Sequence, residues 1–282
     1  MEKIEVIIMI ELSDIQLKQL QKIELEMMIE FDRICKKNGI HYSIIGGTLI
    51  GAVRNNGFIP WDDDVDIMMY REEYERFCSI VEEDLDHTRF YFQNEKNTVG
   101  YRWGYAKLRR KGTKFTREYQ EHMPYEQGIF LDIFPHDYVP DNEFKRRFHN
   151  LKCFIIRKLL WSEVGKKADK KFLMRVWYYL LSLIPVSWVK AMYHRLISTS
   201  NRKQTGYMRS LMFPTFGKDF GYNSEWFEPG VDIEFEGHFF ECMKGAKEYL
   251  SYSYGDYMQL PPENQRKVHP VSELELINVD IM

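Results

Sequence analysis

The sequence predicts an α+β fold in which a mixed sheet core carries an added helical lobe. Short runs of apolar, β-branched and aromatic residues dominate the first half of the 282-residue chain, and helical periodicity with many basic residues takes over from about Asn142. Strands first and helices later are typical of this class. Apolar residues at 44% and aromatic residues at 15% indicate a packed globular protein.

Each element can be placed from local signals. Ser13 and Gln16 form the pattern of a capping box, and apolar residues then recur at helical spacing, so a helix is expected to about Lys37. A short strand at 41–45 leads to GGTLIGAVR, where a helix begins. The further elements expected are a strand at 65–69, a helix at 70–81, strands at 90–94, 103–110 and 128–134, basic helices interrupted by Pro185, a hairpin at 231–243 and a helix at 246–258. The proline-rich tail is expected to be irregular.

Charge divides the chain into parts with different partners. Residues 144–218 contain seventeen Lys and Arg but two acids, a net charge of +15, whereas the other residues carry 22 basic and 40 acidic side chains, a net charge of −18. We expect a core over 1–141, a basic helical lobe over 142–220 that binds a membrane surface or an acceptor, and a segment over 221–282 that packs back on the core. Nucleic acid would leave the acidic residues of the core unexplained, so no nucleic acid is expected.

The sequence predicts a cytoplasmic protein. The four cysteines are widely spaced without a Cys-x-x-Cys pair, which argues against a zinc site or disulfide framework. The N-terminal apolar run is short and flanked by acids, unlike a signal peptide, and no stretch reaches the eighteen or so apolar residues of a transmembrane helix. Residues 176–189 are uncharged, aromatic and flanked by lysines, which is typical of helices lying on anionic lipid. A peripheral position on the inner membrane face and ordinary packing of a helical lobe are the two alternatives for this segment.

The candidate catalytic and metal-binding residues are centred on an acidic run. Asp62, Asp63, Asp64 and Asp66 fall within five residues, directly before an apolar strand. Carboxylates gathered beside a buried strand repel one another unless a cation lies between them. Asp64 and Asp66 alternate along the chain and are expected on one face of the strand, with Asp63 on the other.

The pattern favours magnesium, with manganese as the alternative ion, over calcium. An EF-hand loop that begins at Asp62 would need glycine at its sixth position, where the chain has Ile67. Two carboxylates on a strand instead leave coordination positions for water and substrate phosphate oxygens, the usual arrangement of Mg²⁺. Asp132 stands alone in an apolar strand, between Leu131 and Ile133, and a lone buried carboxylate is costly unless it is paired or ligating. Asp132 is therefore the predicted third ligand or general base.

A Gly-Gly turn precedes the acidic run. Gly46 and Gly47 would let backbone N–H groups approach a phosphate closely, and Thr48 opens a helix whose N-terminus favours anions. The turn is not a Walker A loop, because no lysine follows at the required spacing.

Basic and aromatic residues complete the candidate set. Lys107 and Arg109 are two residues apart on a strand, so both could hold a diphosphate, although an exposed sheet edge explains them equally well. Arg54 ends the helix that begins at the Gly-Gly turn and is a further phosphate candidate. Trp61 lies next to the acids, where it either helps to cage a quaternary ammonium group or packs in the core.

Taken together, these motifs resemble the LicD family of phosphotransferases, whose relatives include fukutin and fukutin-related protein. The resemblance rests on the blocks GGTLIGAVRNNGFIPWDDDVDIMMYREEYERF, GIFLDIFPHD and YGDYMQLPP. It implies a nucleotidyltransferase-like core and places His269 near the site. The family's Gly-Gly turn, D-x-D pair and third acid match Gly46, Gly47, Asp64, Asp66 and Asp132. The zinc-binding cysteines and the membrane anchor of the animal relatives are absent.

The resemblance implies a Mg²⁺-dependent reaction with a CDP-linked donor. A phospho-alcohol group such as phosphocholine would pass to a hydroxyl of a cell-surface glycan (lipopolysaccharide, teichoic acid or capsule) or of its lipid-linked precursor, and CMP would leave. Two alternatives stay open: a nucleotidyltransferase that transfers a nucleotide to a small molecule and releases pyrophosphate, and a non-enzymatic module that binds membranes or polyanions. The presence of all three carboxylates favours an enzyme.

Overall fold

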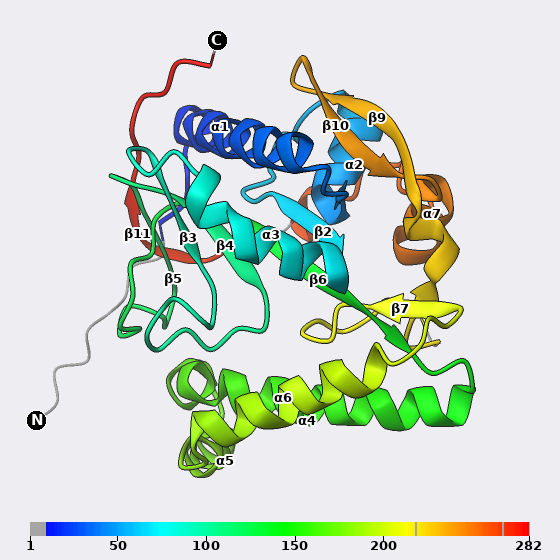
Figure 1. Ribbon diagram of the computed structural model, residues 1–282. Coiled ribbons are helices and arrows are strands. Elements are labelled where there is room, and N and C mark those ends of the chain that lie inside the picture. The colour runs from blue at the N-terminus through cyan, green and yellow to red at the C-terminus, as the bar shows by residue number, and fades with distance from the viewer. Residues whose placement is uncertain (1–9, 218, 267, 282) are drawn as a thin grey trace, which may run out of the picture.

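A mixed sheet lies at the centre of the computed structural model, which describes residues 10–217, 219–266 and 268–281 (Figure 1). The N-terminal apolar run examined for a signal peptide falls mostly within residues 1–9 and so lies outside the described residues. β2 and β6 are parallel, and every other neighbouring pair in this sheet is antiparallel. The strand order is β1 (Ser43–Ile44), β2 (Asp66–Tyr70), β6 (Phe130–Val139), β4 (Ala106–Arg110) and β3 (Phe90–Gln93), and the far half of β6 continues to β7 (Tyr207–Arg209) and β8 (Tyr222–Asn223).

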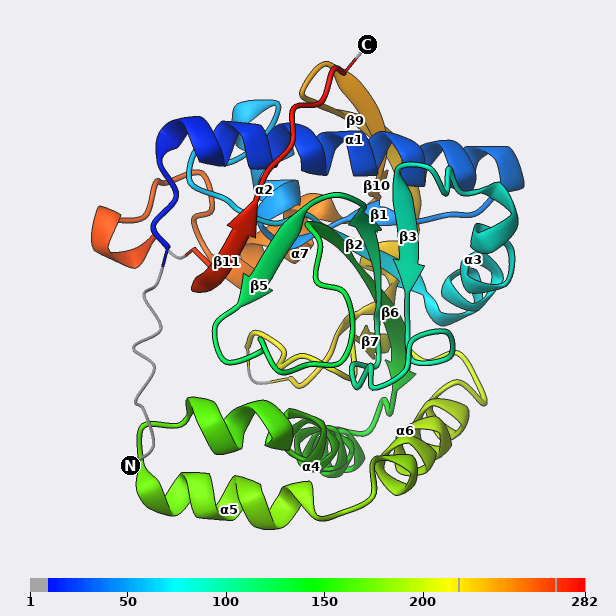
Figure 2. The same ribbon diagram turned by 90° about the vertical axis from the view of Figure 1, so that its left-hand side faces the viewer.

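Helices surround the sheet in separate groups (Figures 1 and 2). The core group consists of α1 (Asp14–Asn38), α2 (Gly46–Asn55) and α3 (Arg71–Asp84). The lobe lies at the opposite end of the molecule from α1 and consists of α4 (Glu143–Ala168), α5 (Phe172–Ser182) and α6 (Val186–Ser200). Beside α2 lie the hairpin of β9 (Pro229–Phe235) and β10 (His238–Met243) and the helix α7 (Ala246–Tyr254). The predicted mixed sheet core with a helical lobe is therefore confirmed.

The start of α1 illustrates how local sequence sets an element. The Ser13 hydroxyl accepts a hydrogen bond from the Gln16 N–H at 3.3 Å, and the Gln16 side chain accepts one from the Ser13 N–H at 3.0 Å. This is the predicted capping box, which satisfies two of the free N–H groups at a helix start. Further along α1, the Phe31 ring packs edge-on against Tyr42, just before β1, at 5.0 Å and at a tilt against Phe77 of α3 at 4.9 Å, so aromatic contacts join α1 to α3 and to the segment that leads into β1.

The prediction of an irregular tail is wrong. Residues Val271–Glu275 form β11, which pairs antiparallel with β5 (Lys114–Arg117), a strand that the sequence did not reveal. Each of these strands is short, and each finds its partner far away along the chain, so no local pattern identifies the pair. The pairing brings the preceding residue His269 back to the core.

Two of the lobe helices have an unusual composition. α5 and α6 together are as long and apolar as a membrane span, but they are bent by 83° at Pro185, and no single helix among the described residues passes the same test. Pro185 is the N-cap of α6, which explains why the helical pattern is interrupted there.

A buried ion pair within the core anchors two residues of the lobe. Arg71, the first residue of α3, donates from Nε to Asp137 Oδ1 at 2.7 Å and from Nη2 to Asp137 Oδ2 at 2.8 Å. Asn201, just after α6, donates to the same Asp137 carboxylate at 2.6 Å. Tyr193 of α6 accepts a further hydrogen bond from Arg71 at 3.3 Å. Because Asp137 is fully buried, its charge depends on these partners.

We predict that Asp137→Asn lowers the free energy of unfolding by about 3–5 kcal/mol, because the largely buried Arg71 would keep only the half-exposed Glu75, at 3.5 Å, as an acidic partner. The double variant Arg71→Met/Asp137→Asn should recover part of this loss, because it removes both charges. Urea denaturation monitored by circular dichroism measures both effects. An Asp137→Asn variant as stable as the wild type would show that this ion pair does not contribute to the stability of the fold.

Candidate active site

Three charged side chains lie on one rung of the central sheet. Asp66 of β2 is in register with Asp132 of β6, and Lys107 of β4 is in register with Asp132 from the other side. Residues on one rung project to the same face of a sheet. Lys107 Nζ forms an ion pair with Asp132, and both side chains are buried.

A cavity of about 310 Å³ opens at this rung. It brings together the predicted residues Gly46, Asp64, Asp66, Asp132 and His269. Arg117 of β5 also lines the cavity, as do six aromatic side chains, namely Phe134, Phe213, Phe216, Tyr222, Tyr249 and Tyr254. The cavity therefore combines carboxylates with aromatic rings.

Burial and mutual repulsion perturb the carboxylates. Burial raises the pKa of Asp66 well above its ordinary value, the charges of Asp64 and Asp132 raise it further, and Lys107 opposes them. Burial likewise raises the pKa of Asp64, although His269 partly offsets the effect. A site with this excess of negative charge gains free energy when a cation enters.

An additional buried carboxylate, on the helix α1, adds negative charge near the acidic run. Glu24 of α1 is 1% exposed, and burial raises its pKa well above the ordinary value. The charges of the four aspartates at 62–66 raise the Glu24 pKa further. Asp62 is similarly affected by burial, by Asp64 and by Asp63, and one of its carboxylate oxygens is buried without a hydrogen-bond partner among the described residues.

The donor set suits a hard divalent cation. Asp64, Asp66 and Asp132 supply carboxylate oxygens, the ligands that Mg²⁺ and Mn²⁺ prefer, from the wall of a cavity with space for a phosphate group. These residues fit the predicted ion by chemistry and line one cavity. Among the described residues, however, the tighter cluster, with its ligand atoms all within 4.8 Å of one another, is formed by Asp63, Asp64 and His269.

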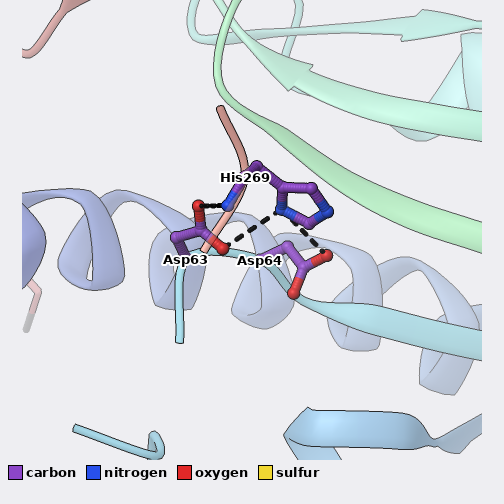
Figure 3. Close-up of side chains that lie close together, drawn as sticks. All are labelled: Asp63, Asp64 and His269. Atoms are coloured by element: carbon purple, nitrogen blue, oxygen red, sulfur yellow. Dashed lines mark hydrogen bonds and ion pairs between the residues drawn. The ribbon is translucent and has the colours of Figure 1, made fainter. Parts of the chain in front are cut away.

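That tighter cluster is a hydrogen-bonded pair, Asp63 and His269, with the second acid Asp64 beside it (Figure 3). Asp63 accepts from the His269 backbone N–H at 2.7 Å and from the ring Nδ1 at 3.1 Å, whereas Asp64 lies 3.6 Å from Nδ1. Both Asp63 oxygens are therefore already used. In Figure 3 both interactions of the ring start from Nδ1, and none is drawn from the second ring nitrogen to either carboxylate.

The Gly-Gly turn lies against the carboxylates. Gly46 has φ of +61°, and a Cβ there would be 3.0 Å from Asp66 Oδ2, while a Cβ on Gly47 would be 2.5 Å from Asp62 Oδ2. Only glycine permits this approach, which places the positive N-terminal end of α2 beside two acids. The Thr48 hydroxyl accepts from the Asp66 N–H at 3.0 Å and so anchors the start of β2.

Trp61 and Arg54 lie outside the cavity. The Arg266 guanidinium lies 4.2 Å from the centre of the Trp61 ring, and Arg54 lies 6.0 Å from it. Arg54 also donates to the Tyr257 carbonyl at 3.1 Å. The ring of Trp61 is thus occupied by a cation of the chain itself, and the structure does not bring it to the acids as a cage for a substrate.

Arg109 is buried away from the acids, although it shares a face of β4 with Lys107. It donates to Gln93 Oε1 at 2.7 Å and to the Gly128 carbonyl at 2.5 Å. Neither residue is on an exposed sheet edge, because Lys107 is 5% and Arg109 is 4% exposed. Both line a second cavity, described below.

Sequence reasoning missed two site residues. Arg117 lies on β5, which has no recognisable strand pattern, and its neighbours Thr116 and Glu118 are both polar, so no local signal marks it. Asp63 was assigned to the opposite face by alternation, but β2 begins only at Asp66, so the alternation of a strand does not extend back to Asp63. Asp63 is 2% exposed and positions His269.

Comparison with known proteins identifies the family. The model described as "LicD/FKTN/FKRP, nucleotidyltransferase domain" matches residues 39–158, which include the Gly-Gly turn and all the aspartates above. The lipopolysaccharide cholinephosphotransferase LicD of Haemophilus influenzae is 31% identical over 94% of this chain and 100% of that protein. The chain belongs to the LicD family. It is an enzyme of the LicD phosphotransferase type, as the three sequence blocks indicated.

Two further matches cover less of the chain. An uncharacterised protein of Rickettsia typhi is 28% identical over 51% of this chain and 47% of that protein. An uncharacterised protein of Rickettsia prowazekii is 40% identical over 23% of this chain and 26% of that protein. These partial matches add no information about substrates to the LicD assignment.

We predict that Asp66→Asn and Asp63→Asn change stability in opposite directions when no divalent cation is present. Because the Asp66 pKa is raised in the folded state, its ionisation destabilises the fold as the pH rises above the ordinary value of 3.8, and Asn removes this cost. Asp63→Asn should lower the free energy of unfolding by about 1.5–3 kcal/mol, because the bonds from His269 lose their charged acceptor. Urea denaturation at pH 7.5 and at acidic pH tests both. An Asp66→Asn variant less stable than the wild type at pH 7.5 would contradict the proposed repulsion.

Proposed function

We propose that the protein transfers phosphocholine from CDP-choline to a hydroxyl of lipopolysaccharide or of its lipid-linked precursor, with Mg²⁺ as cofactor and CMP as the leaving product. The observation that carries the proposal is the cavity at which Asp64, Asp66 and Asp132 meet. The relative named as a lipopolysaccharide cholinephosphotransferase supports the choice of donor and acceptor, since it aligns over its whole length.

Each group has a role in this reaction. Asp64, Asp66 and Asp132 would hold the cation, which supplies charge neutralisation for the diphosphate when bound. Arg117 has a buried Nε without a hydrogen-bond partner among the described residues, and it faces the same carboxylates from β5. Its guanidinium is suited to donate to a phosphate oxygen.

His269 is the general base in this proposal. Its Nδ1 lies at 3.1 Å from the Asp63 carboxylate, so the tautomer that donates there leaves Nε2 free to accept a proton. The acceptor hydroxyl loses its proton to Nε2 as its oxygen forms a bond to the phosphorus that carries choline. The bond between that phosphorus and the oxygen of CMP breaks, and CMP departs as the leaving group.

The aromatic wall of the cavity supports choline as the alcohol. Phe216 and Tyr254 have ring centres 5.0 Å apart, and Phe134 and Phe213 have ring centres 4.7 Å apart. Rings gathered beside carboxylates attract a quaternary ammonium group through both the ring faces and the negative charge. This wall takes the role that the sequence suggested for Trp61.

The outward face of the lobe supports a membrane-bound acceptor. The helix α5 has a single buried residue, Tyr178, and its apolar side chains are exposed, with Leu173 at 79% and Trp177 at 52%. On α6, Trp188 is 69% exposed. Large apolar side chains beside many lysines are typical of helices that lie in the headgroup region of an anionic membrane. We therefore include peripheral membrane binding by α5 and α6 in the proposal.

We predict that CDP-choline, lipopolysaccharide and Mg²⁺ yield CMP and no pyrophosphate, and that chelation of the metal stops turnover. His269→Gln should lower kcat by about 10²–10⁴-fold, because the hydroxyl would lose its proton acceptor. Arg147→Gln, on the exposed side of α4, should react like the wild type and serves as the control. Chromatography of the nucleotide products measures the outcome. Release of pyrophosphate from a nucleoside triphosphate, with CDP-choline inert, would instead identify a nucleotidyltransferase.

We predict that the protein sediments with vesicles that contain anionic lipid and that binding weakens sharply with salt, because the attraction is screened over about 8 Å at physiological ionic strength. Each Lys near such a surface contributes on the order of 1 kcal/mol. A variant with Gln in place of all four lysines should be released from vesicles, and its hydrolysis of soluble CDP-choline should be unchanged. The four positions are Lys166, Lys167, Lys170 and Lys171.

The matched control for this experiment removes four exposed lysines from outside the lobe, at positions 18, 22, 244 and 247. This control should still sediment with the vesicles. Equal sedimentation of the lobe variant and the wild type would exclude the lobe as a membrane-binding surface.

A further inference from the structure

A second cavity, of about 440 Å³, lies between the sheet and the lobe helix α4. Its wall contains five basic side chains and no acidic one. They come from the sheet and from α4 and are Lys107, Arg109, Arg117, Arg157 and Lys158. We call it the cationic cavity, in contrast to the acidic cavity that contains Asp66.

The positive charge in this cavity is largely uncompensated. Lys107 is paired with Asp132, and Arg117 also faces the carboxylates of the acidic cavity, but within the described part of the chain Arg109, Arg157 and Lys158 form no ion pair with a carboxylate. Arg157 donates to the Phe213 carbonyl at 2.8 Å, and Lys158 donates to the Tyr178 hydroxyl at 2.9 Å, so their partners are neutral. Gathering cations around a cavity without anions costs free energy, and an anionic ligand relieves that cost.

The same wall is rich in aromatic rings. Trp103 and Trp161 have ring centres 5.8 Å apart, and the Phe130 ring lies within 6 Å of three of the cations. Aromatic rings stack on nucleobases, and guanidinium groups bind phosphate. A neutral sugar would need hydrogen-bond acceptors, of which the wall offers chiefly the amides of Gln120 and Gln127. The chemistry therefore matches a nucleotide better than a glycan.

The two cavities share part of their walls. Arg117, Phe213 and Pro214 line both of them. CDP-choline, the proposed donor, has a charge distribution that matches the two cavities. It carries an anionic nucleotide at one end and a cationic trimethylammonium group at the other. Its diphosphate joins the two ends, and Arg117 has an unpartnered buried Nε at the junction.

We propose that the cationic cavity binds the CMP half of the donor and that the acidic, aromatic cavity binds the choline half. This placement rests on the proposed function. The opposite charges of the two cavities orient the donor in one direction, so that the phosphorus next to choline lies at the carboxylates and at His269. CMP then leaves on the side of α4.

The test uses the full-length protein, with CMP as the probe in the presence of Mg²⁺. Arg157→Gln/Lys158→Gln should raise the Kd for CMP, measured by titration calorimetry, and the KM for CDP-choline by about tenfold or more. Inhibition by phosphocholine, which occupies the acidic cavity, should be unchanged. The control Lys145→Gln/Arg147→Gln removes the same charge from α4 outside the cavity and should leave all three quantities unchanged. Trp161→Leu, at a half-exposed position, should weaken CMP binding through lost stacking with no change of charge.

Separate outcomes test the placement and the function. The Arg157→Gln/Lys158→Gln variant could turn over CDP-choline normally and with the same KM as the control. That result would overturn the placement and leave the function standing. A raised KM for the glycan acceptor, with the KM for CDP-choline unchanged, would assign the cavity to the acceptor and also overturn it. A wild-type protein that neither binds CMP nor turns over CDP-choline would overturn the proposed function itself.

Discussion

Repulsion among buried carboxylates is the constraint on which the rest of the structure depends. Asp66 and Asp132 are held side by side by the hydrogen bonds of a parallel strand pair, and Asp64 and Glu24 add negative charge from either side. Several elements around them reduce this cost. The N-terminus of α2 approaches the acids through its two glycines, Lys107 pairs with Asp132 from β4, and β5 and the tail bring Arg117 and His269. The net charge of the site still favours a cation.

Features carried by recognisable local elements could be predicted from the sequence, whereas features that depend on contacts between segments far apart along the chain could not. Asp64, Asp66 and Asp132 could be placed together because each lies at a recognisable strand and because the D-x-D pair needs a third acid. The role of Asp63 and the pairing of β5 with β11 could not be foreseen, since both depend on a tail far away along the chain. The same tail places Arg266 over Trp61, so a cation of the chain itself occupies the ring that the sequence suggested for a cage.

The basic middle of the chain has two distinct surfaces in the structure. Its inner side, on α4, contributes Arg157 and Lys158 to the cationic cavity, whereas its outer side, on α5, exposes large apolar side chains such as Leu173. A single net charge of +15 in the sequence therefore serves two proposed partners, a nucleotide and a membrane. Asp137 and Arg71 of the core bind Asn201 and Tyr193 of the lobe by hydrogen bonds, and these contacts join the lobe to the core.

Calorimetric titration of Mg²⁺, with and without a non-hydrolysable CDP-choline analogue, tests most directly whether the carboxylates form a metal site that the donor completes. Mg²⁺ dehydrates reluctantly and takes part of its coordination from substrate phosphates. We expect weak binding to the protein alone, binding about tenfold tighter or more with the analogue, and loss of this gain in Asp132→Asn. Tight Mg²⁺ binding without the analogue, or the same gain in Asp132→Asn, would contradict this view of the site.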